Sequence, residues 1–252
     1  VRFLPLGGWW GHVVLAQRLI VKTRRGDVVG VVGSKPPHEI REEDRRKVLE
    51  IKDLYIDVGA SSDWDVRRKL DIRPGDPIVP ESPFTVMANP DLLLAKAWDN
   101  RVGCAIAAEV VRRLDGVAHP NTVFAVGTVQ EEVGLRGAKT AASRIQPDVG
   151  IGLDVTLSCD TPGVPKEEAV TIQGNGCGLH VMDSSFIADA SLIDELEAVA
   201  KKNRIKYQRT ILARGGQDGA AIQQSMFGAR AAGIVVGTRY IHTVTEMVDK
   251  KD

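Results

Sequence analysis

Four acidic residues and one histidine stand beside segments that we expect to be strands or helices of a sheet-based domain. They are Asp99, Glu131, Glu132, Asp154 and His242. Carboxylate oxygens and imidazole nitrogens are the ligands that Zn²⁺, Co²⁺ and Mn²⁺ accept in proteins. Acidic groups gathered at one place repel one another unless a cation lies among them. We therefore interpret the set as a candidate site for two divalent metal ions, a chemistry that suits amide hydrolysis.

Each of these residues also has an ordinary structural explanation. Asp99 and its neighbour Asn100 could cap a helix, a role that both residue types commonly fill. Glu131 and Glu132 could stabilise a helix N-terminus through its dipole. His242 could be a surface histidine. Only the convergence of all the candidates on one edge of a sheet favours the metal site.

The adjacent pair Glu131-Glu132 supports two different roles. Neighbouring side chains project in different directions, so one glutamate can bind a metal ion while the other remains available. The second carboxylate can then act as a general base that takes a proton from water.

The segments after residue 83 predict how these residues are positioned. Helical and strand patterns alternate there, which is typical of an α/β domain with a mixed, largely parallel sheet flanked by helices. Ligands gather beyond the carboxyl ends of strands in such sheets, where we expect the candidate residues. We predict helices at Arg101–Leu114, Gly134–Ile145 and Ser191–Lys202, and buried strands at Thr122–Val129, Val149–Leu153 and Ala231–Val236.

The N-terminal part of the chain has a different pattern. The β-rich runs Leu15–Thr23 and Val28–Val32 flank a turn sequence, Arg24-Arg25-Gly26-Asp27, which predicts a hairpin. We therefore predict two domains, with residues 1–80 as a small β-rich domain and residues 81–252 as the α/β domain.

Composition excludes some classes of protein and partner. The 252 residues include 33 basic and 33 acidic side chains, so net charge gives no reason to expect nucleic acid or a membrane surface as partner. We find no apolar run of the roughly 20 residues that span a bilayer. Three scattered cysteines form no CxxC pair, which favours a reducing, cytoplasmic compartment and no structural zinc. The chain begins without methionine, and we interpret it as a piece of a longer protein.

Longer motifs surround the candidate residues. They are Ala97–Arg101 (AWDNR), Thr128–Gly137 (TVQEEVGLRG) and Thr238–His242 (TRYIH), with further matches at Leu15–Arg18, Lys35–His38 and Ile56–Ala60. In these motifs the chain resembles the M42 metallopeptidases, which include tetrahedral, glutamyl and deblocking aminopeptidases. The resemblance implies that residues 1–80 form a smaller β-barrel-like inserted domain that helps dimerisation and assembly. It also implies peptide substrates and a homo-oligomer, a dodecamer built from dimers.

The resemblance further implies a role for each candidate residue. Asp99 would bridge two Zn, Co or Mn ions, Asp154 would bind one of them, and Glu132 and His242 would bind the other. Glu131 would be the general base.

The chain departs from the family pattern in places. The family has a further metal-binding histidine, in an HxD motif upstream of the inserted domain, which this chain does not contain. The other histidines do not lie in that context, and we assign none of them as a ligand; they are His12, His38, His119 and His180. We expect His12, His38 and His119 to be structural or exposed. Gln217 stands where the family usually has threonine, and Gly237 where it commonly has proline.

Two alternatives to an aminopeptidase remain open from the sequence. Paired carboxylates also serve glycoside hydrolysis, so a metal-dependent or carboxylate-based endoglucanase is one of them. A non-catalytic assembly subunit that keeps the fold without the complete site is the other.

Overall fold

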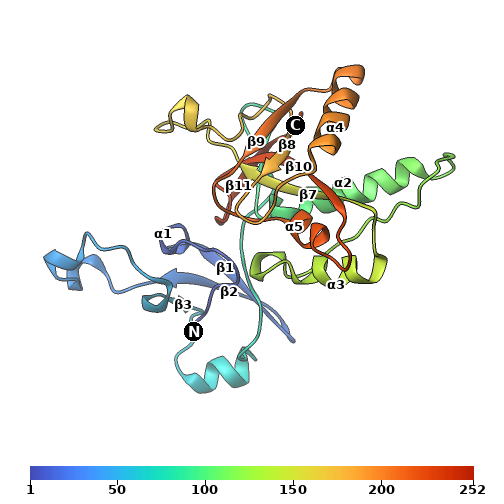
Figure 1. Cartoon of the computed structure of the whole chain (residues 1–252). Helices are drawn as coiled ribbons and strands as arrows, with labels where there is room; N and C mark the ends of the chain where they lie inside the picture. Colours follow the sequence, from blue (N-terminus) through green and yellow to red (C-terminus); the bar gives the residue numbers. More distant parts are fainter. The chain divides into compact units, whose positions relative to one another are not determined.

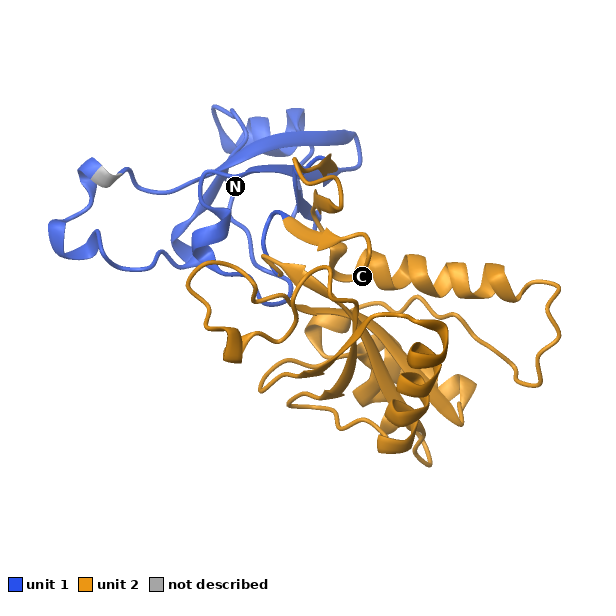
Figure 2. Ribbon diagram, turned by 90° about the horizontal axis from the view of Figure 1, so that it is seen from above, with its two compact units in different colours: residues 1–83, 242–245 blue, residues 84–241, 246–252 orange. Residues whose placement is uncertain are grey.

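The computed structural model describes residues 1–252, except for the side chain of Pro37, as two compact units. Unit 1 comprises residues 1–83 and 242–245, and unit 2 comprises residues 84–241 and 246–252 (Figure 2). The second segment of unit 1 is a short connection between two strands of unit 2.

Unit 1 contains a four-stranded antiparallel sheet in the order β3-β2-β1-β4. Strands β1, β2 and β3 of this sheet are labelled in Figure 1. The strands are β1 (Arg18–Thr23), β2 (Gly26–Gly33), β3 (Tyr55–Asp57) and β4 (Ile78–Pro80). Thr23 pairs with Gly26 across a two-residue turn, and Gly26 has a φ of 125° that favours glycine. The predicted hairpin is therefore confirmed.

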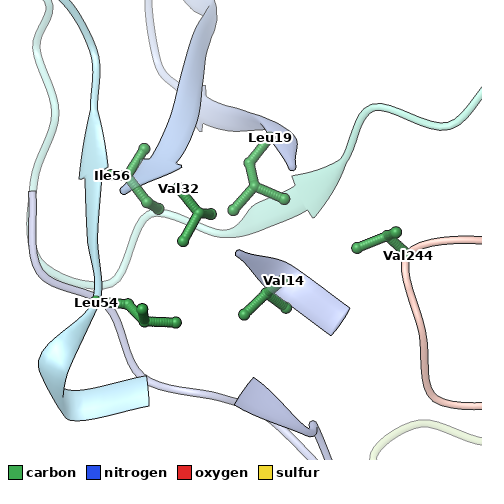
Figure 3. Packing of buried hydrophobic residues seen from close by; sticks show 6 residues of the cluster. All are labelled: Val14, Leu19, Val32, Leu54, Ile56 and Val244. Atoms are coloured by element: carbon green, nitrogen blue, oxygen red, sulfur yellow. The ribbon is translucent and has the colours of Figure 1, made fainter. Parts of the chain in front are cut away.

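The core of unit 1 is a cluster of buried aliphatic side chains (Figure 3). Its members are Val14, Leu19, Val32, Leu54, Ile56 and Val244. They come from strands β1 to β3 and from short helical segments and connections between strands, so burial of one apolar face ties these elements together. The short helical segments are α1 (Gly11–Val14), η1 (Pro37–Glu39), η2 (Glu42–Asp44), η3 (Ile51–Asp53) and η4 (Asp65–Lys69).

Unit 2 is built on a seven-stranded mixed sheet. Its path runs β5-β6-β11-β10-β8-β9, and β7 pairs with β10. The strands are β5 (Thr85–Val86), β6 (Leu92–Ala95), β7 (Val149–Leu157), β8 (Cys177–Met182), β9 (Tyr207–Ile211), β10 (Arg230–Arg239) and β11 (Glu246–Asp249).

The prediction that the strands of this sheet are largely parallel is wrong. Only the pairs β7–β10 and β8–β9 are parallel among the described strands, and the other pairs along the path are antiparallel. Parallel neighbours need a crossover of a dozen or more residues, whereas the connection from β10 to β11 is residues 240–245. A short connection therefore forces these strands to run in opposite directions.

Helix α2 (Trp98–Leu114) contacts β7 and contributes Val102 and Ile106 to an apolar cluster with Val155 and Val236. Asp99 and Asn100 have non-helical backbone angles, so regular helix begins near Arg101, as predicted. Asn100 Oδ1 accepts a hydrogen bond from the backbone N–H of Gly103 at 2.9 Å, which confirms its capping role. The other helices of unit 2 are α3 (Arg136–Ile145), α4 (Ala190–Asn203), α5 (Asp218–Gln223), η5 (Glu131–Val133) and η6 (Lys166–Glu168).

Residues 122–129 do not form the predicted buried strand. Their backbone is irregular, and the side chains of Phe124 and Val129 are 60% and 67% exposed. None of the described strands pairs with this segment. A strand is stabilised by its neighbour in the sheet, so an apolar β-rich sequence without such a neighbour stays irregular.

The described helices also bear on membrane association. None of them combines the length and the apolar character that a bilayer-spanning helix requires.

Candidate metal centre

Asp99, Glu132 and His242 lie together although they are distant in sequence. Each offers one ligand atom, and these atoms are all within 4.8 Å of one another. Two atoms bound to one ion at about 2.0–2.2 Å are at most about 4.4 Å apart. Small side-chain adjustments would therefore let all three atoms bind one ion.

The start of α2 positions Asp99. The backbone N–H of Asp99 donates to Glu246 Oε2 at 2.9 Å, and Glu246 is a buried residue of β11. The next residue, Asn100, donates from Nδ2 to the carbonyl of Leu153 on β7 at 2.7 Å. The segment carrying Asp99 is thus tied to two strands of the sheet.

A tight turn positions Glu131 and Glu132. Both lie on η5, which follows Gln130 in a left-handed conformation with φ 60°. The carbonyl of Glu131 accepts hydrogen bonds from the backbone N–H groups of Gly134 at 2.9 Å and Leu135 at 2.8 Å. Glu132 joins Asp99 and His242, whereas Glu131 is not a member of that three-atom group.

Asp154 lies within β7 rather than at the end of a strand, so its predicted position is wrong. Strand β7 continues to Leu157 because it pairs with β10 along its whole length. Burial raises the pKa of Asp154 well above its usual value, and the negative charge of Asp99 raises it further. Glu131 and Asp218 add to the same effect, so these carboxylates lie near one another.

This cluster fits divalent metal ions. A buried carboxyl whose pKa is raised by neighbouring carboxylates lacks a compensating positive charge, which a bound cation would supply. The donors are carboxylate oxygens and one imidazole nitrogen, a set that Zn²⁺, Co²⁺ and Mn²⁺ all accept. The cysteines are unpaired, and none belongs to the three-atom group.

The remaining histidines are not members of this group. His180 is 3% exposed, and its Nδ1 and Nε2 atoms lie 3.0 Å from Thr210 Oγ1 and 3.0 Å from Asp183 Oδ2 respectively. His119 Nδ1 lies 2.7 Å from the carbonyl of Asn121, on an exposed turn. His12 is adjacent to the ring of Trp10, and His38 lies on η1. His180 is thus buried between a hydroxyl group and a carboxylate.

Two acidic residues near the candidate site were not singled out from the sequence. Glu246 contacts the backbone of Asp99, and Asp218 accepts a hydrogen bond from Thr128 Oγ1 at 2.5 Å. Burial raises the pKa of Asp218, and its Oδ1 atom is buried without a hydrogen-bond partner among the described residues. The sequence signal for Asp218 was its place directly after Gly215-Gly216-Gln217, at the start of a helix.

Residues 1–252 match the model of the M42 glutamyl aminopeptidase family. The chain belongs to this family. It is similar to the glutamyl aminopeptidase of Lactococcus lactis subsp. cremoris strain MG1363, with 34% identity over 244 residues, 96% of this chain and 67% of the relative.

Two solved structures of TET proteins have the same fold. A TET aminopeptidase from a marine sediment archaeon of the Thaumarchaeota is 41% identical and superposes with a TM-score of 0.93, over 98% of this chain and 69% of the other. The dodecameric PhTET1-12s is 29% identical with a TM-score of 0.82, over 98% and 70% of the two chains. The chain thus spans about two thirds of each relative's length.

Proposed function

We propose that this protein is a metal-dependent aminopeptidase that uses two divalent ions, zinc, cobalt or manganese, to remove N-terminal residues from peptides. The observation that carries the proposal is the group Asp99, Glu132 and His242, whose ligand atoms lie within 4.8 Å of one another. Membership of the M42 family supports the choice of peptides as substrates.

The ligands divide between two metal positions. Asp99 would serve both, Glu132 and His242 would serve one, and Asp154 would serve the other. The mutual proximity of the Asp99 and Asp154 carboxylates, which raises the pKa of Asp154, supports this division. Divalent ions held by these residues would lower the pKa of a bound water and polarise a peptide carbonyl.

Glu131 is the general base. Its carboxylate accepts a proton from the attacking water and later delivers that proton to the leaving amine. Two observations support this role: Glu131 is outside the three-atom group, and its charge acts on the neighbouring Asp154. The hydrogen bonds of its backbone carbonyl to Gly134 and Leu135 fix the turn that carries it.

The two parts of the chain have different tasks in this proposal. Residues 81–252 supply the peptidase site, and residues 1–80 form a β-rich inserted domain that supports dimerisation and assembly. We propose a homo-oligomer, a dodecamer built from dimers. The dodecameric solved relative supports this assembly.

The complete protein is the material for the test. After removal of metal and addition of Zn²⁺, Co²⁺ or Mn²⁺, we expect hydrolysis of aminoacyl p-nitroanilides and two bound ions per subunit, counted by elemental analysis. A complete protein that binds metal yet releases no N-terminal residue from anilides or from a peptide mixture would overturn the proposed function. Static light scattering tests the dodecamer separately.

A further inference from the structure

A hydrogen bond joins the start of α5 to the segment that leads into Glu131. Thr128 Oγ1 donates to Asp218 Oδ2 at 2.5 Å, although the residues are 90 positions apart in the sequence. Thr128 lies three residues before Glu131. Thr128 therefore belongs to the segment that leads directly into the turn that carries Glu131 and Glu132.

The other side of this segment is held by the backbone that follows the turn. The N–H groups of Leu135, Arg136 and Gly137 donate to the carbonyls of Glu131, Gln130 and Val129 at 2.8, 3.2 and 2.8 Å respectively. A Cβ atom at Gly137 would lie 2.4 Å from the backbone N of Val129, so the two backbones are in close contact. Backbone hydrogen bonds thus hold the three consecutive carbonyls of residues 129–131.

This turn contains strained backbone. Gln130 and Leu135 adopt left-handed conformations with φ of 60° and 56°. Each costs about 1–2 kcal/mol for a residue other than glycine, so surrounding contacts must maintain them. The Thr128–Asp218 hydrogen bond is such a contact at the beginning of the turn.

Asp218 is itself anchored on the sheet through Gln217. Gln217 is 3% exposed, and its Oε1 atom accepts from the backbone N–H of Gly219 at 2.9 Å. Its amide lies against glycines of two strands, because a Cβ at Gly152 would be 1.9 Å from Oε1 and a Cβ at Gly233 would be 2.8 Å from Nε2. The first residue of α5 is therefore fixed relative to β7 and β10.

We propose that Asp218 is a positioning residue, which holds the Glu131 turn in place through Thr128 and so connects that turn to β7 and β10. The inference rests on the proposed function only for the reaction that Glu131 serves. Asp218 does not touch the substrate in this scheme. Its Oδ1 atom is buried without a hydrogen-bond partner among the described residues, and its Oδ2 atom accepts the hydrogen bond from Thr128.

The first test separates the hydrogen bond of Thr128 from its packing, in the complete protein. Thr128→Val keeps the shape and removes the hydroxyl, whereas Thr128→Ser keeps the hydroxyl and removes a methyl group. We expect Thr128→Val to lower kcat by about 10- to 100-fold, with KM within about threefold and metal content unchanged, because small misplacement of a catalytic group costs up to about 10². Thr128→Ser should keep kcat within about threefold of the wild-type value, because the hydroxyl is retained.

Matched controls and a double variant complete this test. Thr140→Val removes an exposed hydroxyl that bonds only the backbone of its own helix, and Asp194→Ala removes an exposed acid from α4. Both should retain wild-type kcat. Asp218→Ala combined with Thr128→Val should lose no more activity than either single variant, because both remove the same hydrogen bond. Losses that multiply in the double variant would overturn the proposal, as would an impaired Thr128→Ser beside a normal Thr128→Val.

A second readout needs no enzymatic activity. The amides of Gly134, Leu135, Arg136 and Gly137 report on the stability of the turn, because each donates a hydrogen bond to a carbonyl of residues 129–131. In the metal-free protein we expect their hydrogen exchange to accelerate at least about tenfold in Thr128→Val and to stay unchanged in Thr128→Ser and Thr140→Val. Unchanged exchange in Thr128→Val would overturn the inference even for an active enzyme. Absence of activity from the wild type would instead overturn the proposed function and leave this exchange test valid.

Discussion

Replacement of Glu131 by glutamine removes the proposed general base with almost no change of shape. The amide cannot accept the proton of the attacking water, so we expect kcat to fall by about 10²- to 10⁴-fold, or about 2.7–5.4 kcal/mol in the barrier. Metal content should stay at the wild-type level, because Glu131 is not one of the three clustered ligand atoms.

Glu132→Gln gives the comparison that makes this prediction specific. It weakens one of three clustered ligand atoms and leaves Asp99 and His242. Loss of a residue that only hydrogen-bonds to a metal ligand costs about 10- to 100-fold in metal affinity. Because Glu132 is proposed to bind the metal itself, its replacement should lower the affinity by more than that. Glu195→Gln, at an exposed position of α4, is the matched control and should change neither activity nor metal content.

The assay combines elemental analysis of the purified complete protein with steady-state hydrolysis of an aminoacyl anilide. Equal metal loss in the Glu131 and Glu132 variants would show that their roles are wrongly divided. Glu131→Gln with kcat within tenfold of wild type would refute its role as the base.

Three further predictions concern metal, acid and packing. Exhaustive chelation should abolish activity, and Zn²⁺, Co²⁺ or Mn²⁺ should restore it; activity that survives chelation would instead favour the carboxylate-based endoglucanase. Burial raises the pKa of Asp160, but hydrogen bonds, above all from Arg239, lower this pKa below its usual 3.8. The ion pair between Asp160 and Arg239 therefore stabilises the fold fully above pH 3.8, and this stabilisation is lost as the pH falls through the lowered pKa. Asp160→Asn should therefore lower the free energy of unfolding by about 1.5–3 kcal/mol at pH 7, with the difference from wild type shrinking below pH 4 in denaturant titrations; a constant difference contradicts this. Gly152→Ala should lower the free energy of unfolding by about 1–3 kcal/mol, because the added Cβ would lie 1.9 Å from Gln217 Oε1. Gly127→Ala is the control: its Cβ would have open space around it, so the free energy of unfolding should not change in the same titrations.

Local sequence determined the elements whose signals need no distant partner. The hairpin between β1 and β2 follows from a turn sequence that only a few backbone conformations satisfy, with Gly26 at the position of positive φ. The start of regular helix near Arg101 follows from the capping amide of Asn100 and the apolar spacing of Val102 and Ile106. The candidate ligands were also identified from residue type and motif alone.

Tertiary structure decided what depends on neighbours in space. The strand-like sequence of residues 122–129 stays irregular because no described strand pairs with it, and β7 continues past Asp154 because β10 lies beside it. Whether neighbouring strands run parallel or antiparallel depends on which strands pair and how they are connected. Hydrophobic periodicity in the sequence indicates neither. The hydrogen bond between Thr128 and Asp218 joins residues 90 positions apart, so only the folded chain brings that donor and acceptor together. Such contacts escape sequence patterns because they depend on side-chain distances that arise after the strands have packed.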